Sequence, residues 1–584
     1  MRQRGIDLLP CVRGGGSCRG GNVILDAPVK GLSNGSLAVL VVIVAAGAAL
    51  RFYHLGAQSL WMDEVVSAEA ARQIDSDGFT VVAQKDNASP LSHWLIWLSM
   101  KTAGTSDAAV RLPSAVAGVF AIVFVFLLAR ELSSARAALW AAAFAALSPI
   151  ALWYAQDARM YSLVFALAAV TLYVFWRAIE NPRSPALWAA LAAATAASVY
   201  THQYAVLLSA ACGLFLLFYG KPRSIFLKWL ATQAVAAAAF VPWVILTLHR
   251  AGSGAGSAKA GAVMWGPYTF WSFLYGFSLG PSVRELHVSG GVAAVAPYVW
   301  MMIPLVLAGA AVFVAGGVRL LWGRTRKAGV LCLVCLAVPL AAATAAAMFT
   351  NVSYNVRYVM GAFPAFAVVM GAGLANEKRS KVVFAAGVVL AAGMAFSIVN
   401  WYTDGRYAKE DSRSAARFLS AAVAENDMVI ISSTPSAQTL GYYGFHRGGA
   451  IRVTQKNLKD VAAAVREGDF RGAKHVWLVE SRQWESDPRG ELRRALERSA
   501  VLSDKRTWPG VTVMTYVPRL TMPEAKGPGG RASAGADGVG DRRAPGRRDD
   551  GEYHYVRLPV LAFEAATSAS AYIRTQRALR SPDA

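Results

Sequence analysis

The residues able to do chemistry lie in short segments between long apolar runs. One such segment carries two adjacent carboxylates, Asp63 and Glu64, directly after Trp61 and Met62. A carboxylate beside a transferable proton can act as a general base. Neighbouring side chains on a helix point about 100° apart, so both carboxylates cannot face one substrate hydroxyl equally. We therefore predict that Asp63 is the base or holds the acceptor and that Glu64 orients it.

The same pair of carboxylates also has a structural interpretation. Acidic residues in the first turn of a helix complement the helix dipole. Asp63 and Glu64 would then begin an amphipathic helix that lies on a membrane surface. The residue types alone leave both interpretations open.

Other polar residues lie at the edges of apolar runs, where ionisable groups are costly and often functional. Their carboxylates could hold an acceptor, a sugar or a metal ion, and the planar guanidinium of arginine pairs well with phosphate oxygens. A phosphate at a membrane edge suggests a lipid-linked phosphate. The alternatives are a neutral pair of Asp157 with Arg159 and a belt of interfacial anchors. The predicted substrate-binding residues are Asp86, Asp157, Arg159, Tyr161, His202, Arg357 and Tyr358.

The elements that must position these residues are membrane-spanning helices. The chain has 584 residues and a net charge of +22, with 16% charged and 55% hydrophobic residues. A soluble domain carries about 25% charged residues, and the mean hydropathy here is +0.38. Because a span needs about 20 apolar residues, the sequence predicts a polytopic α-helical membrane protein of about eleven helices. These spans are 36–53, 109–129, 137–155, 160–178, 186–200, 204–219, 225–248, 293–321, 328–349, 357–375 and 382–400.

The connections between the spans alternate in charge, which predicts an orientation. Cytoplasmic loops are enriched in Lys and Arg, and every second connection is basic, as at 130–136, 177–183, 221–228, 319–327 and 378–381. The N-terminus is therefore expected inside. The long first outer loop 54–108, and everything after residue 400, are expected outside the cytoplasmic membrane.

The ends of the chain differ in composition from the membrane region. Residues 1–35 form a basic, Gly-rich tail without the features of a cleaved signal peptide, and we expect them to be disordered. Residues 401–518 alternate helix-like and strand-like runs and predict a small α/β domain outside the membrane. Residues 519–584 are rich in Gly, Pro, Ala and Arg and predict a disordered tail.

The chain resembles the GT-C superfamily of polytopic glycosyltransferases, specifically glycosyltransferase family 39. That family includes bacterial relatives of the dolichyl-phosphate-mannose-protein mannosyltransferases, and the lipopolysaccharide galacturonosyltransferase group is related. At the segment 86–91, where the family pattern is D-x-H-P-P-L-like, the His and one Pro are missing. The segments that carry the resemblance are Trp61-Met62-Asp63-Glu64, Arg111-Leu112-Pro113-Ser114, Ser148-Pro149, Tyr154 to Leu163, Tyr200-Thr201-His202, Arg357-Tyr358 with Pro364, and Lys409-Glu410-Asp411.

This resemblance implies a GT-C-like catalytic region over 36–400 and transfer of a sugar from a polyprenyl-phosphate donor. The acceptor would be a lipid, a glycan or a protein at the outer face of the membrane. No cofactor is certain, and a divalent metal stays open because no spacing in the chain is diagnostic of one. A transporter or flippase of lipid-linked sugars is the alternative, and so is a membrane anchor that displays the outer domain. The basic composition is not interpreted as nucleic-acid binding.

Overall fold

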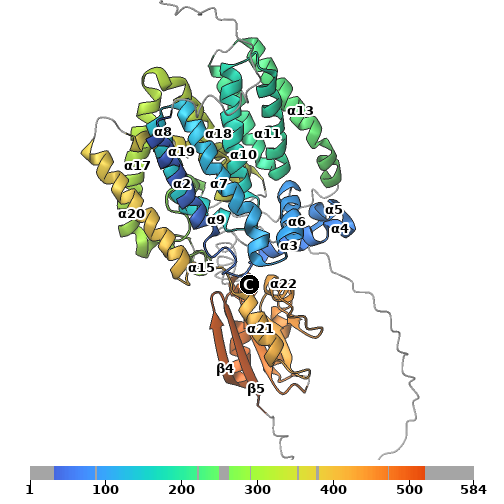
Figure 1. Ribbon diagram of the computed structural model, residues 1–584. Coiled ribbons are helices and arrows are strands. Elements are labelled where there is room, and N and C mark those ends of the chain that lie inside the picture. The colour runs from blue at the N-terminus through green and yellow to red at the C-terminus, as the bar shows by residue number, and fades with distance from the viewer. Residues whose placement is uncertain are drawn as a thin grey trace, which may run out of the picture.

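The computed structural model describes residues 32–85, 89–219, 222–248, 262–289, 291–350, 354–375, 380–470 and 472–519. Of the two predicted tails, residues 1–31 of the first and 520–584 of the second lie outside the described residues. Asp86 also lies outside them. A bundle of long helices forms most of the molecule, and a small sheet domain lies at one end of it (Figure 1).

Helices occur at all eleven predicted places. Within the described residues, eight helices are long and apolar enough to cross a membrane, or nine if the bent pair α8 and α9 is one span. The two other predicted spans are shorter helices, α11 with 17 residues and α12 with 13. The helices of the bundle are α2 (Asn34–Phe52), α7 (Asp107–Leu132), α8 (Ala135–Leu147), α9 (Pro149–Ala155), α10 (Tyr161–Glu180), α11 (Pro185–Thr201), α12 (Val206–Phe218), α13 (Arg223–Leu248), α14 (Ala262–Tyr275), α17 (Val299–Leu321), α18 (Arg326–Phe349), α19 (Phe363–Leu374) and α20 (Lys381–Thr403).

The break between α8 and α9 is stabilised by a buried arginine. Pro149 begins α9 with Ser148 as its N-cap, and the two helices meet at 55°. Proline has no backbone N–H, so carbonyls of the preceding turn lose their helical donors. The guanidinium of Arg51 in α2 donates to the carbonyls of Ala145 and Ala146 at 2.9 and 3.0 Å. This break turns the chain into the segment 156–160.

The predicted basic connections contact one another at one end of the bundle. Lys228 donates to the carbonyl of Pro182 at 2.8 Å, and Arg177 pairs with Glu131 at 3.2 Å. Arg319 in α17 donates to the carbonyl of Ala375 after α19. The connections that alternate with them include the segment 54–106, whose helices lie at the opposite end beside the sheet domain (Figure 1).

Short helices fill the first long connection and several other linkers. The first connection supplies the small layer that separates part of the bundle from the sheet domain, and its helix α3 lies against the domain helix α22. These elements are α3 (Met62–Arg72), α4 (Ile74–Asp77), α5 (Thr80–Lys85), α6 (Leu91–Ala103), η1 (Gln203–Ala205), α15 (Val283–Ser289), α16 (Gly291–Val295), η2 (Ala296–Tyr298), η3 (Gly323–Thr325) and η4 (Val356–Ala362).

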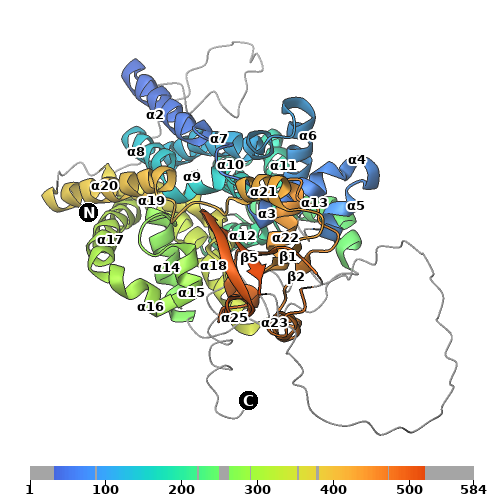
Figure 2. The same ribbon diagram turned by 90° about the horizontal axis from the view of Figure 1, so that it is seen from below.

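The C-terminal domain contains a five-stranded mixed sheet in the order β2-β1-β3-β5-β4. Strands β2, β1 and β3 are parallel, whereas β5 runs antiparallel to β3 and β4. Seen from below, the domain lies over the middle of the bundle end (Figure 2). Its elements are α21 (Ser412–Ala422), β1 (Met428–Ile431), α22 (Thr434–Tyr442), β2 (Ile451–Arg452), α23 (Leu458–Arg466), β3 (Val476–Glu480), α24 (Gln483–Ser486), α25 (Glu491–Ser499), β4 (Ala500–Trp508) and β5 (Val511–Pro518).

Alternation along the strands gives this sheet two apolar faces. Ile430 and Leu478 face the cluster that includes α23 and α25, whereas Val429 and Val479 face the cluster of α21 and α22. Helices therefore cover both faces, as expected for parallel strands. The face with α21 and α22 is the one turned toward α3.

Candidate active site

The two adjacent carboxylates occupy the first turn of α3 and point in different directions. Glu64 is fully buried, whereas the Asp63 side chain is 17% exposed. The backbone N–H of Trp61 donates to Glu64 at 3.2 Å, which closes the helix N-terminus as in a capping box. Asp63 turns toward the membrane helices instead. The predicted divergence of the two side chains is therefore present.

Glu64 is held by two cations and two backbone groups. Arg111 of α7 donates from Nε and Nη2 to the two carboxylate oxygens, both at 2.7 Å. The Lys409 ammonium lies 3.0 Å from Oε2, and the backbone N–H of Ala158 donates at 2.8 Å. Burial acts to raise the pKa of Glu64, but Arg111 and Lys409 outweigh it and hold the pKa at about 2. Glu64 is thus an anchor that stays charged near neutral pH.

Asp157 lies next to this group and shares the same lysine. Its carboxylate accepts from the Trp61 indole at 2.8 Å and from Lys409 at 2.9 Å. Burial raises the pKa of Asp157, and Lys409 opposes that rise. The alternative of a neutral pair between Asp157 and Arg159 is not what the structure shows for Asp157, because its ionic partner is Lys409.

Asp63 faces arginines from two other elements. Arg357 of η4 lies 3.1 Å from the Asp63 carboxylate. Arg159 donates to the backbone carbonyl of Asp63 at 3.2 Å and to the hydroxyl of Ser67 at 2.8 Å. Both arginines are buried, with 8% of Arg357 and 6% of Arg159 exposed. A partly exposed carboxylate and two arginines therefore share one site.

Aromatic side chains surround Arg357. Its guanidinium carbon lies 5.6 Å from the ring centre of Tyr161 and 5.4 Å from that of Tyr358. The His202 ring lies 5.9 Å from each of these tyrosine rings, and Tyr204 stacks on Tyr358 at 4.9 Å. Burial, together with the positive charges of Arg357 and Arg159, lowers the pKa of His202 to about 3. His202 is therefore a neutral hydrogen-bonding group.

Eight of the nine predicted site residues come from distant segments and meet in this region. Asp86 is the exception, because it lies outside the described residues. Three contributors were visible only as members of motifs, namely Trp61, Arg111 and Lys409, and Tyr204 carried no signal except its place near His202. The residues that the structure brings together are Asp63, Glu64, Asp157, Arg159, Tyr161, His202, Arg357 and Tyr358.

The same carboxylates were candidates for a divalent metal. Across the described residues, no group of three or more His, Cys, Asp or Glu side chains is placed to hold a metal ion. Glu64 and Asp157 are already neutralised by Arg111 and Lys409. Their geometry fits a charge-balanced scaffold better than a set of metal ligands.

Comparisons with known proteins bear on the family and the fold of the chain. A family model described as dolichyl-phosphate-mannose-protein mannosyltransferase matches residues 87–246. A curated relative, an uncharacterized protein of Aquifex aeolicus (strain VF5), is 26% identical over 183 residues, which are 30% of this chain. The match covers 37% of that relative's length.

Two solved structures are similar over most of the chain. ArnT from Cupriavidus metallidurans in the apo state has a TM-score of 0.50 at 14% identity, over 82% of this chain and 98% of ArnT. The archaeal oligosaccharyltransferase AglB from Archaeoglobus fulgidus, in complex with an inhibitory peptide and a dolichol-phosphate, has a TM-score of 0.50 at 13% identity. That likeness covers 84% of this chain and 75% of AglB.

These findings define the class of the protein. It is a polytopic helical membrane protein with a small C-terminal sheet domain, as predicted. Its fold is similar to those of ArnT and AglB, and the mannosyltransferase model that matches residues 87–246 supports the GT-C resemblance drawn from the motifs.

Proposed function

We propose that this protein is an integral-membrane glycosyltransferase that transfers a sugar from a polyprenyl-phosphate donor to an acceptor hydroxyl. One observation carries the proposal, namely that Asp63 shares its site with Arg159 and Arg357. A carboxylate supplies the base, and arginines suit the phosphate of the donor. The fold of the GT-C enzymes and the dolichol-phosphate in the AglB complex support the same donor class.

The chemistry needs few groups. The acceptor oxygen attacks the anomeric carbon while its proton passes to the Asp63 carboxylate. The bond between the anomeric carbon and the phosphate oxygen breaks, and the phosphate leaves with the electron pair. Arg357 and Arg159 stabilise the charge that grows on this phosphate, so the leaving group needs no proton. Tyr161, His202 and Tyr358 offer hydrogen bonds around the sugar or the phosphate.

The two charge-balanced carboxylates have supporting roles in this proposal. Glu64 orients Asp63 from the adjacent position, and Asp157 fixes the Trp61 indole. Asp86 is proposed as a further acceptor-binding or sugar-binding carboxylate.

We also propose where the reaction takes place. The basic connections meet at one end of the bundle, and Lys and Arg favour the cytoplasmic side. The site and the C-terminal domain would then lie at the outer face of the cytoplasmic membrane, where a lipid, glycan or protein acceptor would enter.

The test uses the purified full chain in lipid nanodiscs. The protein is incubated with a panel of polyprenyl-phosphate sugars and candidate acceptors, with empty nanodiscs as the control, and donors are followed by mass spectrometry. The proposal predicts loss of one donor with release of free polyprenyl phosphate. If no donor is consumed, with or without divalent metal, the proposal fails and a transporter of lipid-linked sugars becomes the better account.

A further inference from the structure

The C-terminal domain holds the backbone that leads into the first turn of α3. The backbone N–H of Leu60 donates to the Tyr443 hydroxyl at 2.6 Å, and that hydroxyl donates to Asp107 at 2.7 Å. The Ser59 hydroxyl donates to the carbonyl of Glu410 at 2.5 Å. Polar groups of the domain therefore fix the segment 59–60, which directly precedes the proposed base.

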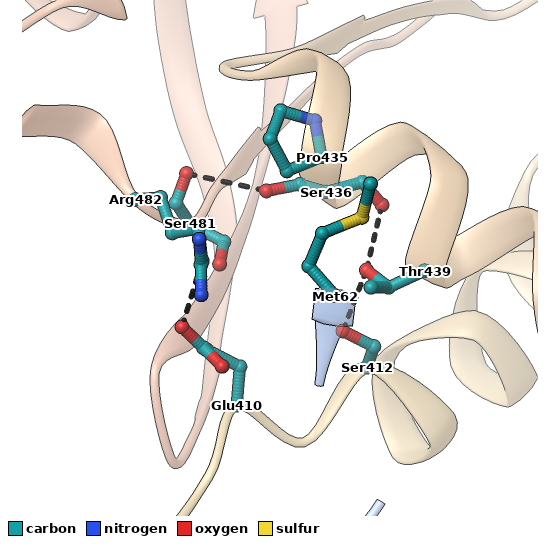
Figure 3. A pocket seen from close by; sticks show the side chains of 8 residues that line it. All are labelled: Met62, Glu410, Ser412, Pro435, Ser436, Thr439, Ser481 and Arg482. Carbon is teal, nitrogen blue, oxygen red and sulfur yellow. Dashed lines mark hydrogen bonds and ion pairs between the residues drawn. The ribbon is translucent and has the colours of Figure 1, made fainter. Parts of the chain in front are cut away.

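Side chains of the domain also enclose the two residues before Asp63. The Met62 side chain lines a small pocket together with Ser436 and Thr439 of α22 and Arg482 after β3 (Figure 3). Arg482 pairs with Glu410 at 2.9 Å. Its guanidinium carbon lies 5.7 Å from the ring centre of Trp61. The domain therefore contacts the two residues that precede the proposed base.

Lys409 of the domain contacts the buried charged residues of the site. Its side chain is 4% exposed, and its ammonium lies 3.0 Å from Glu64 and 2.9 Å from Asp157. It also donates to the carbonyl of Gln156 at 3.1 Å. With Arg111, the group contains two buried carboxylates and two buried cations, so its net charge is zero.

Charge balance matters here because the group is buried. Removing one partner of a buried ion pair leaves an uncompensated charge and is strongly destabilising. Without Lys409, one guanidinium would face the two carboxylates Glu64 and Asp157. The first of these belongs to the same helical turn as Asp63, and the second holds the Trp61 indole. An imbalance would therefore act on both sides of the proposed base.

We propose that Lys409 is a positioning residue for the transfer reaction, through which the C-terminal domain sets the place of Asp63. The domain is then a part of the active-site scaffold and not a separately displayed module. This inference rests on the proposed function for its kinetic consequence, but its structural consequence is independent of that function.

The test compares four full-length variants in nanodiscs. Lys409→Met removes one positive charge, and Asp157→Asn removes one negative charge. The double variant Lys409→Met/Asp157→Asn restores neutrality around Glu64 and Arg111. Lys459→Met, an exposed lysine on α23 of the same domain, is the matched control.

Hydrogen–deuterium exchange of the segment 58–66 is the first measurement. We expect Lys409→Met to accelerate exchange there by about tenfold or more, because the buried charge is unbalanced. The double variant should return toward the wild-type rate, and Lys459→Met should not differ from it. The inference is overturned if Lys409→Met exchanges like the wild type. It is also overturned if the change in exchange rate in the double variant equals the product of the changes in the two single variants.

Transfer kinetics are the second measurement. A misplaced base lowers kcat more than it raises KM for the donor, so Lys409→Met should lose at least about tenfold in kcat with donor KM changed less than about threefold. A fall in kcat and a rise in donor KM by the same factor would contradict a positioning role. If Lys409→Met fails to accumulate while the double variant accumulates, the charge-balance argument is supported; if neither accumulates, it is overturned.

The two proposals fail in different ways. A wild-type protein that consumes no donor, but shows the expected exchange pattern, would remove the glycosyltransferase proposal and keep the role of Lys409 in placing the segment. An active wild type whose exchange and kcat are unchanged by Lys409→Met would keep the glycosyltransferase proposal and remove the positioning role of Lys409.

Discussion

The guanidinium of Arg357 lies 3.1 Å from the carboxylate of Asp63, although 294 positions separate the two residues in the chain. One belongs to η4 at the start of a late membrane helix, and the other to the first turn of α3. Their contact joins the proposed base to a proposed phosphate-binding group. A donor phosphate would give Arg357 a second anionic partner and draw the reacting groups together.

Arg357→Gln should slow transfer strongly. The substitution keeps a hydrogen-bonding side chain but removes the charge that stabilises the leaving phosphate, so kcat should fall by about 10²–10³-fold. Initial rates of polyprenyl-phosphate release measure this loss. Arg417→Gln, at an exposed position on α21, is the control and should keep the wild-type rate. Wild-type turnover by Arg357→Gln would remove Arg357 from the mechanism.

Glu64→Gln should damage the fold of the first connection. The variant leaves Arg111 and Lys409 with one carboxylate, Asp157, and breaking a buried pair of this kind costs about 3–5 kcal/mol. A lower melting temperature in nanodiscs is the expected result. Glu425→Gln, at an exposed position before β1, should melt with the wild type. Equal melting of Glu64→Gln and wild type would contradict the anchor role.

Acid should remove the stabilisation that Glu64 provides. Its pKa is lowered from 4.5 to about 2, so its contribution is fully present above pH 4.5 and is lost as the pH falls toward 2. Asp157, whose pKa is raised by burial and less by the Glu64 charge, works in the opposite direction, and burial, the larger cause, is common to both proteins compared. The difference in melting temperature between wild type and Glu64→Gln should therefore shrink across this range. A constant difference would refute the assignment.

His202 should not govern the pH dependence of transfer near neutrality. Its pKa is lowered from 6.5 to about 3, so the ring stays neutral between about pH 5 and 8, where an ordinary histidine would titrate. Its favourable contribution to stability is present above pH 6.5 and is lost as the pH falls toward 3. The rate profiles of wild type and His202→Gln should run parallel over the neutral range. A limb near pH 6.5 in the wild type that the variant lacks would contradict this neutral state.

Helix positions in the bundle, except that of α14, could be predicted because each depends on a local property, the length of an apolar run. The predicted spans 186–200 and 204–219 still coincide with helices, although α11 and α12 are short. Within the predicted α/β domain, strand β4 has no alternation of apolar residues to mark it, because it is an edge strand whose residues Ser503 to Arg506 are polar and exposed.

The site was predictable in its residue types but not in its pairings. Polar residues at the edges of spans indicated Asp157 and Arg159, and their proximity in sequence suggested that they pair. The structure gives Asp157 a partner 252 positions away, Lys409, because the C-terminal domain folds back over α3. Tertiary packing alone decides such a contact, and no local pattern contains it.

The most direct test of the account is the activity of Asp63→Asn. The variant keeps the shape of the side chain and removes the base, and Asp75→Asn, an exposed aspartate on α4 of the same connection, is the matched control. Donor consumption is measured for both in nanodiscs, and exchange over 58–66 checks that the loop stays folded. The account predicts that Asp63→Asn loses transfer while its exchange and insertion match the wild type and Asp75→Asn stays active. Full activity of Asp63→Asn with a verified donor would contradict it.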